Sequence, residues 1–276
     1  MNDHREAPAP APDPGEAAVH RWRALERELA PHGVLLDGFH ALKHALRFGA
    51  EVPLALTDDR TAALALAADL APDLTGALAA RLHEVPSAAL GALLARPHPT
   101  GVAALAVRAP GLAPDSPGPA ATDRGPAHPR TAPLIVLDNP RHLGNIGAVI
   151  RLAAGCGAAG VLTTGTVDPW HPQVVRAGAG LHFATAVERR EPADLPAGPV
   201  YALDPEGADL RTLTLPDDAL LAFGSERHGL SAGLRARADH LVALPMRPQV
   251  SSYNLATSVA MTLYHWMAQP KPPPSP

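Results

Sequence analysis

The sequence has little of several residue types, and each shortage narrows the kind of protein that it encodes. One cysteine, Cys156, among 276 residues excludes an intrachain disulfide and is typical of a reducing compartment. Aromatic residues make up 4% of the chain, so we expect cores built from alanine, leucine and valine. Arginine stands in place of lysine almost everywhere, since Lys43 and Lys271 are the only lysines.

Long apolar runs and a strong excess of positive charge are also absent. No apolar run approaches the ~20 residues of a membrane-spanning helix. The first residues contain no hydrophobic signal-peptide core, so we expect a cytoplasmic protein without a membrane partner. The formal net charge of −4 excludes a strongly basic nucleic-acid binder, but it leaves room for a local basic patch that binds RNA.

Apolar periodicity predicts two α/β domains separated by a linker. A first series of helix and strand patterns ends at Val107, and a second begins at Leu134. Proline, glycine and alanine dominate between them, which favours an extended linker. The expected parts are a tail at 1–15, a domain at 16–108, a linker at 109–132, a domain at 133–269 and a tail at 270–276.

Apolar strands that alternate with helices in the second series are typical of a mainly parallel sheet covered on both faces. The predicted fold class is therefore α/β. The strands expected in the two series cover residues 52–57, 82–85, 102–107, 134–137, 161–164, 199–204, 219–223 and 240–245. In the second series, one helix is expected to begin near Gly144. Three more are expected at residues 172–177, 232–238 and 253–268.

The second series opens with a strand, a turn and a helix, a combination that commonly binds ligands in α/β proteins. Asn145 lies at the mouth of the expected helix and Arg151 on its flank. Residues 155–160 match the pattern GxGxxG, but they follow a helix and precede a strand, the reverse of a dinucleotide-binding corner. We therefore predict a helix C-terminal turn there, with Cys156 as a small packing residue.

Two further stretches carry polar residues directly after apolar strands. In GSERHGLS (224–231), a glycine lets the backbone approach a ligand and Glu226 offers an acceptor, but a plain solvated turn explains the pattern equally well. In LPMRPQVSSYNLATSVA (244–260), Ser252 and Asn254 can point into the same crevice. The alternative is that Ser251 or Ser252 only caps the following helix.

A metal site is not expected. His40 and His44 lie four residues apart on a predicted helix, as metal ligands can, but there is no HExxH glutamate and no third ligand at a telling spacing.

The motifs occur together and in order, and this combination resembles the SpoU/TrmH family of RNA 2′-O-ribose methyltransferases, in the SPOUT superfamily. Asn145 with Arg151, then GSERHGLS, then LPMRPQVSSYNLATSVA are similar to its three motifs. Residues 173–187 are similar to the link between motifs, and residues 33–108 resemble the ribosomal-protein-like substrate-binding domain of many members.

The resemblance implies a methyltransferase domain at 133–269 with a deep C-terminal trefoil knot, preceded by an RNA-binding domain. It implies S-adenosylmethionine as the cofactor and a homodimer, for which the helix from Tyr253 to Trp266 is the interface candidate. The implied cofactor-binding residues are Gly224, Ser225, Glu226, Gly229, Leu244, Met246, Ser252, Tyr253 and Leu255. The implied catalytic residues are Arg151, Asn145, Glu226, Ser252 and Asn254.

Arg151 is the central catalytic residue that the resemblance implies. A guanidinium group stays protonated in proteins, so we expect it to clamp a phosphate and the developing oxyanion rather than to act as a base. Two positions depart from the family pattern: Gly178 stands where many members have serine, and Tyr253 replaces leucine.

The function implied is methylation of a ribose 2′-hydroxyl in RNA, with ribosomal RNA as the expected substrate. A tRNA methyltransferase, an antibiotic-resistance rRNA methyltransferase and a non-catalytic RNA-binding factor stay open as alternatives. The side chains considered for phosphate contacts are Arg21, Arg27, Lys43, Arg47, Arg141, Arg176 and Arg227.

Overall fold

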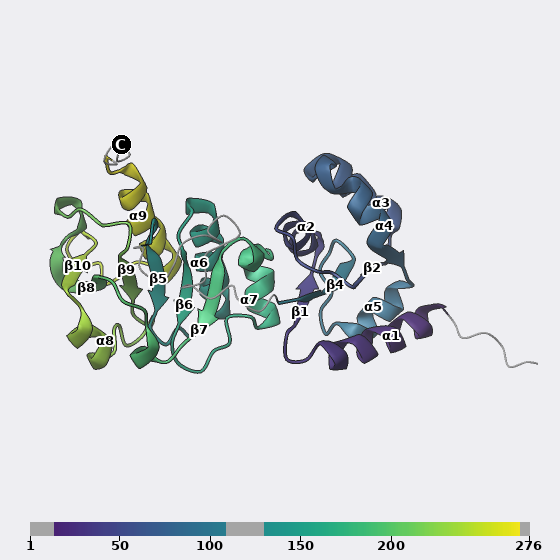
Figure 1. The fold of residues 1–276 in the computed structure, drawn as a ribbon, viewed down its shortest axis with the longest axis horizontal. Helices are drawn as coiled ribbons and strands as arrows, with labels where there is room; N and C mark the ends of the chain where they lie inside the picture. Colours follow the sequence, from purple (N-terminus) through teal and green to yellow (C-terminus); the bar gives the residue numbers. More distant parts are fainter. Residues whose placement is uncertain (1–13, 109–129, 271–276) are drawn as a thin grey trace, which may run out of the picture. The chain divides into compact units, whose positions relative to one another are not determined.

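The structure is a computed structural model, and it describes residues 14–108 and 130–270 (Figure 1). The expected tails and most of the expected linker lie outside the described residues. The chain divides into two compact units, Met1–Phe39 with Val52–Val107 and His40–Glu51 with Arg108–Pro276. The limits of the domains expected from the sequence stay a prediction.

A four-stranded sheet in the order β1-β4-β2-β3 forms the first unit. Strand β4 pairs antiparallel with β1 and β2, and β2 pairs parallel with β3. The elements are α1 (Pro14–Leu29), β1 (Gly33–Asp37), β2 (Leu54–Thr57), α3 (Arg60–Leu70), η1 (Pro72–Leu74), α4 (Thr75–Arg81), β3 (Leu82–Glu84), α5 (Ser87–Leu93) and β4 (Val102–Val107). The three strands expected here are confirmed, whereas β1 and α4 were not predicted.

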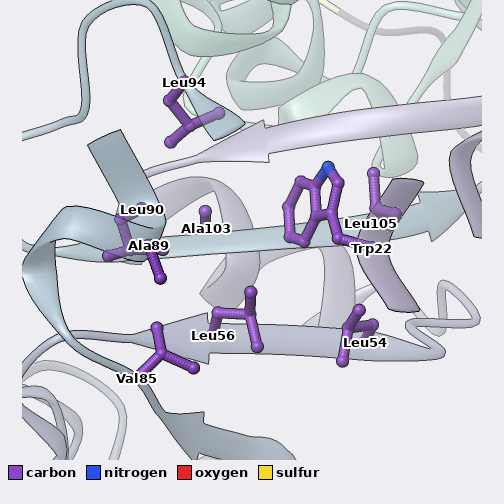
Figure 2. Packing of buried hydrophobic residues seen from close by; sticks show 9 residues of the cluster. All are labelled: Trp22, Leu54, Leu56, Val85, Ala89, Leu90, Leu94, Ala103 and Leu105. Carbon is purple, nitrogen blue, oxygen red and sulfur yellow. The ribbon is translucent and has the colours of Figure 1, made fainter. Parts of the chain in front are cut away.

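Trp22 of α1 lies in the core of the first unit and is fully buried (Figure 2). It packs in one cluster with Leu56 of β2, Leu105 of β4 and Leu90 of α5. The rest of this cluster is aliphatic, as the low aromatic content predicts. One indole therefore supplies much of the volume that small alanine side chains leave unfilled.

The second unit is built on a six-stranded sheet in the order β10-β8-β9-β5-β6-β7, and every pair of neighbours is parallel. Its elements are α2 (Phe39–Arg47, from His40 onward), β5 (Leu134–Leu137), α6 (Leu143–Cys156), β6 (Gly160–Thr163), α7 (Pro172–Ala177), η2 (Leu181–Phe183), β7 (Ala186–Arg189), η3 (Pro192–Asp194), β8 (Val200–Asp209), η4 (Leu210–Thr212), β9 (Leu220–Phe223), α8 (Ala232–Arg237), β10 (His240–Ala243) and α9 (Leu255–Ala268). The α/β class and the parallel sheet are confirmed.

Helices pack against this sheet because its strands are apolar on both faces. All residues of β5, β6 and β9 are buried. Leu134 and Val136 of β5 pack in one cluster with Leu234 of α8, on one face of the sheet. The alternate residues Ile135 and Leu137 are buried too, and they point to the opposite face. Helices α7 and α9 both pack against α6.

The order of the strands creates a crevice between β5 and β9. The chain runs outward from β5 through β6 to β7, then crosses to β8 and returns to β9 beside β5 (Figure 1). The segments after β5 and β9 therefore leave neighbouring strands in different directions at the carboxyl edge of the sheet. Such a switch point is where open α/β sheets bind their ligands.

A buried carboxylate ties the loops at this edge together. Asp138 follows β5 directly and is 4% exposed. It accepts hydrogen bonds from Thr164 Oγ1 at 3.0 Å and from the backbone N–H of Ser231 at 2.6 Å. The loops after three neighbouring strands, β5, β6 and β9, are thus held in one arrangement.

Several details differ from the expectations. Strand β7 was not predicted, and β8 continues past Asp204 to Asp209. The sequence suggests Ser87 as the cap of the helix that follows it, but Pro86 occupies the N-cap position of α5 and Ser87 is the first helical residue. The helix C-terminal turn near Cys156 is confirmed, since Gly157 caps α6 with φ of 71°.

The contact of α6 with α7 predicts that Gly147→Ala destabilises the second unit. A Cβ at this position would lie 2.5 Å from Ala177 Cβ and 2.6 Å from the Val174 carbonyl oxygen. Overpacking of this kind costs about 1–3 kcal/mol. The free energy of unfolding from urea titration measures the loss.

Gly155→Ala on the same helix is the matched control, because a Cβ there meets nothing within 4 Å. It is expected to be neutral or to stabilise by up to about 1 kcal/mol, since alanine favours the helix over glycine. Equal stabilities of the two variants would contradict the close packing at Gly147.

Candidate functional site

A cavity of about 570 Å³ opens at the carboxyl edge of the sheet. Its wall comes from the segments after β8, β9 and β10 and from the starts of α6 and α9. Its volume lies in the range of about 300–1,000 Å³ that is usual for small-molecule sites. The predicted site residues that line it are Asn145, Gly224, Ser225, Glu226, Gly229, Leu244, Met246, Ser252, Tyr253, Asn254 and Leu255.

Three polar side chains in the wall form a hydrogen-bonded chain. Asn254 Nδ2 donates to Asn145 Oδ1 at 3.1 Å, and Asn145 Nδ2 donates to Glu226 Oε1 at 2.8 Å. The three residues come from the starts of α9 and α6 and from the loop after β9. An amide can accept from one neighbour and donate to the other, so Asn145 fixes the orientation of both.

Asn254 also determines where α9 begins. Its Oδ1 accepts the backbone N–H groups of Ala256 at 2.9 Å and Thr257 at 3.4 Å, so it is the N-cap. The capping role considered for Ser251 and Ser252 is therefore wrong, and Tyr253 lies outside the helix. Ser252 lines the cavity.

Glu226 is ionised at neutral pH. Partial burial would raise the pKa of its carboxyl, but hydrogen bonds from Asn145 and from backbone N–H groups, including those of Arg141 and His142, bring the pKa below its usual value. The second carboxylate oxygen, Oε2, is 3.4 Å from the backbone N–H of Arg141. Glu226 can therefore accept hydrogen bonds and balance positive charge in the cavity, but it cannot act as an acid there.

The loop after β9 is closed by backbone hydrogen bonds. Ser225 N–H donates to the Gly229 carbonyl at 2.9 Å, and Gly229 N–H donates to the Ser225 carbonyl at 3.0 Å. Gly229 has a φ of 65°, the left-handed conformation that such short loops require. A Cβ on Gly224 would lie 2.1 Å from the backbone of Gly229. Glycine is therefore necessary at 224 because the backbone of Gly229 approaches it closely, and not because a ligand does.

Sequence reasoning missed the wall that β8 contributes. Ala202 pairs with Leu241 and Ala208 pairs with Val242, so residues 203–207 bulge out of the ladder with β10. Leu203, Asp204 and Pro205 of this bulge line the cavity. Arg235 of α8 holds this segment through Asp204 at 2.9 Å and Glu206 at 2.7 Å. Its hydrogen bond lowers the pKa of Asp204. The Asp-Pro pair after an apolar strand was the available signal.

Arg151 does not line the cavity. It is exposed on α6, six residues beyond Asn145. Six residues correspond to about 600° of helical rotation, which turns the two side chains to different sides of the helix. Its guanidinium has no hydrogen bond or ion pair to any described residue, so its predicted role depends on a group that another molecule brings.

Both departures from the family pattern have a local explanation. A Cβ on Gly178 would lie 2.9 Å from His182 Cε1, so the buried imidazole fills the space of a larger side chain. Burial lowers the pKa of His182 to about 4, although its hydrogen bond to the Pro169 carbonyl opposes the shift. The Tyr253 hydroxyl donates to the Pro245 carbonyl at 3.0 Å and shapes the loop that lines the cavity.

Cys156, His40 and His44 do not line the cavity. Cys156 is half-buried, and burial raises the pKa of its thiol. Within residues 14–108 and 130–270 no group of three or more histidine, cysteine, aspartate or glutamate side chains could hold a metal ion. No helix in those ranges is long and apolar enough to cross a membrane.

Part of the second unit matches the model of a known family. Residues 132–264 match the model of the SpoU rRNA Methylase family. An uncharacterized tRNA/rRNA methyltransferase of Synechocystis is 33% identical over 150 residues, which are 50% of this chain and 53% of that protein. The 23S rRNA (uridine(2479)-2′-O)-methyltransferase of Streptomyces viridochromogenes is 30% identical over 149 residues, 49% of this chain and 52% of that protein. The chain thus spans about half the length of these curated relatives.

One solved structure shows the same fold over most of the chain. The SpoU methyltransferase AviRb from Streptomyces viridochromogenes, solved in complex with AdoMet, has a TM-score of 0.68 and 24% identity. The match covers 91% of this chain and 97% of that one.

The hydrogen-bonded chain predicts that Asn145→Ala raises the pKa of Glu226. The variant removes the side-chain donor that stabilises the carboxylate, while burial, which favours the neutral form, remains. NMR titration of the Glu226 carboxyl carbon measures the change. In the wild type the lowered pKa of Glu226 adds to the free energy of unfolding, and this contribution is lost as the pH falls through that pKa. Asn145→Ala should lose less stability over the same pH range.

Asn254→Ser is the control, because Asn254 donates to Asn145 and not to Glu226, and serine keeps the helix cap. Its effect on the pKa of Glu226 should be smaller. An unchanged pKa in Asn145→Ala would show that the amide does not stabilise the carboxylate.

Proposed function

We propose that this chain, whose residues 132–264 belong to the SpoU rRNA Methylase family, methylates a ribose 2′-hydroxyl of RNA with S-adenosylmethionine as the methyl donor. The observation that carries the proposal is the chain Asn254–Asn145–Glu226 in the wall of one small-molecule cavity. The name of the Streptomyces relative supports ribosomal RNA as the substrate. The same proposal includes a trefoil knot in the second unit, RNA binding by the first unit and a cytoplasmic location.

The residues around the cavity fit the proposed cofactor. When bound, S-adenosylmethionine supplies an electrophilic methyl group on a positively charged sulfur. Leu244, Met246 and Leu255 offer apolar surface suited to an adenine ring, and backbone groups of Gly224 and Tyr253 can bond its polar edges. The Glu226 carboxylate places a negative charge in the same wall, which favours a cation.

The chain must also orient the 2′-hydroxyl and help it to lose a proton. Because the pKa of Glu226 is lowered, its carboxylate is a weak base, and we assign to it, Ser252 and Asn254 the positioning of reactants. Arg151 would clamp a phosphate of the RNA and the developing oxyanion, since its fork matches phosphate oxygens. The proton then leaves to a phosphate oxygen or to water.

A homodimer is part of the proposal. Helix α9 leaves Tyr264 73% exposed and Met267 46% exposed, whereas Val259 and Leu263 of the same helix are buried. Exposed aromatic and methionine side chains are enriched in protein interfaces. Multi-angle light scattering of the full chain tests it, and the mass of one chain at micromolar concentration would contradict the dimer.

The activity is tested by transfer of labelled methyl groups to ribosomal subunits and to tRNA, with nuclease mapping of the product. Transfer to a ribose of ribosomal RNA is expected. Transfer to tRNA instead would correct the substrate class, and no incorporation into either RNA would contradict the activity.

Arg151→Ala is expected to slow the transfer by about 100-fold or more, because the charge that stabilises the transition state is lost. The affinity for S-adenosylmethionine should not change, since Arg151 does not line the cavity. Arg211→Ala is the control, because Arg211 of η4 is exposed and pairs with Asp209 of β8. Wild-type turnover of Arg151→Ala would exclude the clamp.

A further inference from the structure

A second cavity of about 740 Å³ adjoins the first. His142, Ser225, Glu226 and Arg227 line both cavities. The second cavity extends from this shared wall past Arg141 and the first turn of α6. A ligand can therefore reach both cavities around Glu226.

Positive charge dominates the second cavity. Arg141 and Arg227 contribute two positive charges and Glu226 one negative charge, a net of +1 (2 − 1) with the histidines neutral. Neither guanidinium has a hydrogen bond or an ion pair to any residue that the structure describes. Arg235 and Arg237 of the same unit differ, since Arg235 pairs with two carboxylates and Arg237 donates to three backbone carbonyls.

The acidic group of the wall does not neutralise these arginines. Glu226 is bound by the Asn145 amide at 2.8 Å and approached by the backbone N–H of Arg141 at 3.4 Å, not by either guanidinium. In addition, His142 at the N-cap of α6 makes no side-chain capping bond, and the first backbone N–H groups of a helix favour anions. The second cavity thus combines two available guanidinium forks with backbone donors.

We propose that this second cavity binds a phosphate of the RNA backbone next to the ribose that enters the first cavity, with Arg141 and Arg227 as its ligands. The inference rests on the proposed function, because it takes RNA as the methyl acceptor. A guanidinium binds a phosphodiester through two parallel hydrogen bonds. A phosphate bound in the second cavity holds the attached ribose towards Ser252 and Asn254, which line the first cavity.

The experiment uses the full chain saturated with S-adenosylhomocysteine and two probes, the dinucleotide UpU and its uncharged methylphosphonate analogue. NMR shift titration gives the two dissociation constants. The wild type is expected to bind the charged probe about tenfold tighter, the effect of a charge-assisted hydrogen bond. Arg141→Ala and Arg227→Ala are expected to lose this preference, and Arg211→Ala is expected to keep it.

Equal binding of the two probes by the wild type, no binding of either, or an unchanged preference in both cavity variants would overturn the proposal. The cofactor carboxylate is the other anion that these arginines could bind. Calorimetry with S-adenosylmethionine separates the two, since a weaker cofactor affinity in Arg141→Ala and Arg227→Ala, with the probe preference intact, also overturns it.

Methyl transfer by the same variants separates this proposal from the proposed function. An active wild type with an unchanged KM for RNA in both variants would sink the phosphate site and leave the activity standing. An inactive wild type that still prefers the charged probe, and loses the preference in the variants, would sink the activity and leave the phosphate site standing.

Discussion

The candidate site depends on one amide side chain that both accepts and donates. Asn145 accepts a hydrogen bond from Asn254 and donates one to Glu226, so it joins the starts of α6 and α9 to the loop after β9. An aspartate in its place could not donate to a carboxylate, and an apolar residue could do neither. The low pKa of Glu226 and the fixed position of the α9 N-cap both follow from this arrangement.

The sheet makes this arrangement possible. The order β9-β5-β6 brings the carboxyl ends of β5 and β9 together, and the buried Asp138 holds the loops that follow. One edge therefore presents two adjoining cavities, a polar and apolar one suited to a cofactor and a basic one suited to RNA. They share the wall that carries Glu226, so the proposed phosphate site adjoins the cavity in which donor and ribose are proposed to meet.

The sequence predicts much of the second unit because its strands are short, apolar and bounded by polar turns. Most of the cavity wall was predicted through the resemblance to the SpoU/TrmH family, because the strand pattern alone left a solvated turn at 224–231 and a helix cap at 251–252 open. The Asp204-Pro205 pair signals the end of an apolar strand, but the bulge that brings it to the cavity could not be predicted, because it depends on pairing with β10 and on Arg235. The sequence offered Ser251 or Ser252 as the cap of α9, whereas the backbone places Asn254 there, with its Oδ1 accepting from Ala256 and Thr257.

We propose that the cavity beside Asn145 and Glu226 holds the methyl donor. A crystal structure of the full chain grown with saturating S-adenosylmethionine tests it most directly. We expect the cofactor between the loop at 224–229 and the segment at 244–255, with its sulfur towards Glu226. A cofactor bound elsewhere, or none bound in this cavity at saturation, would contradict this placement.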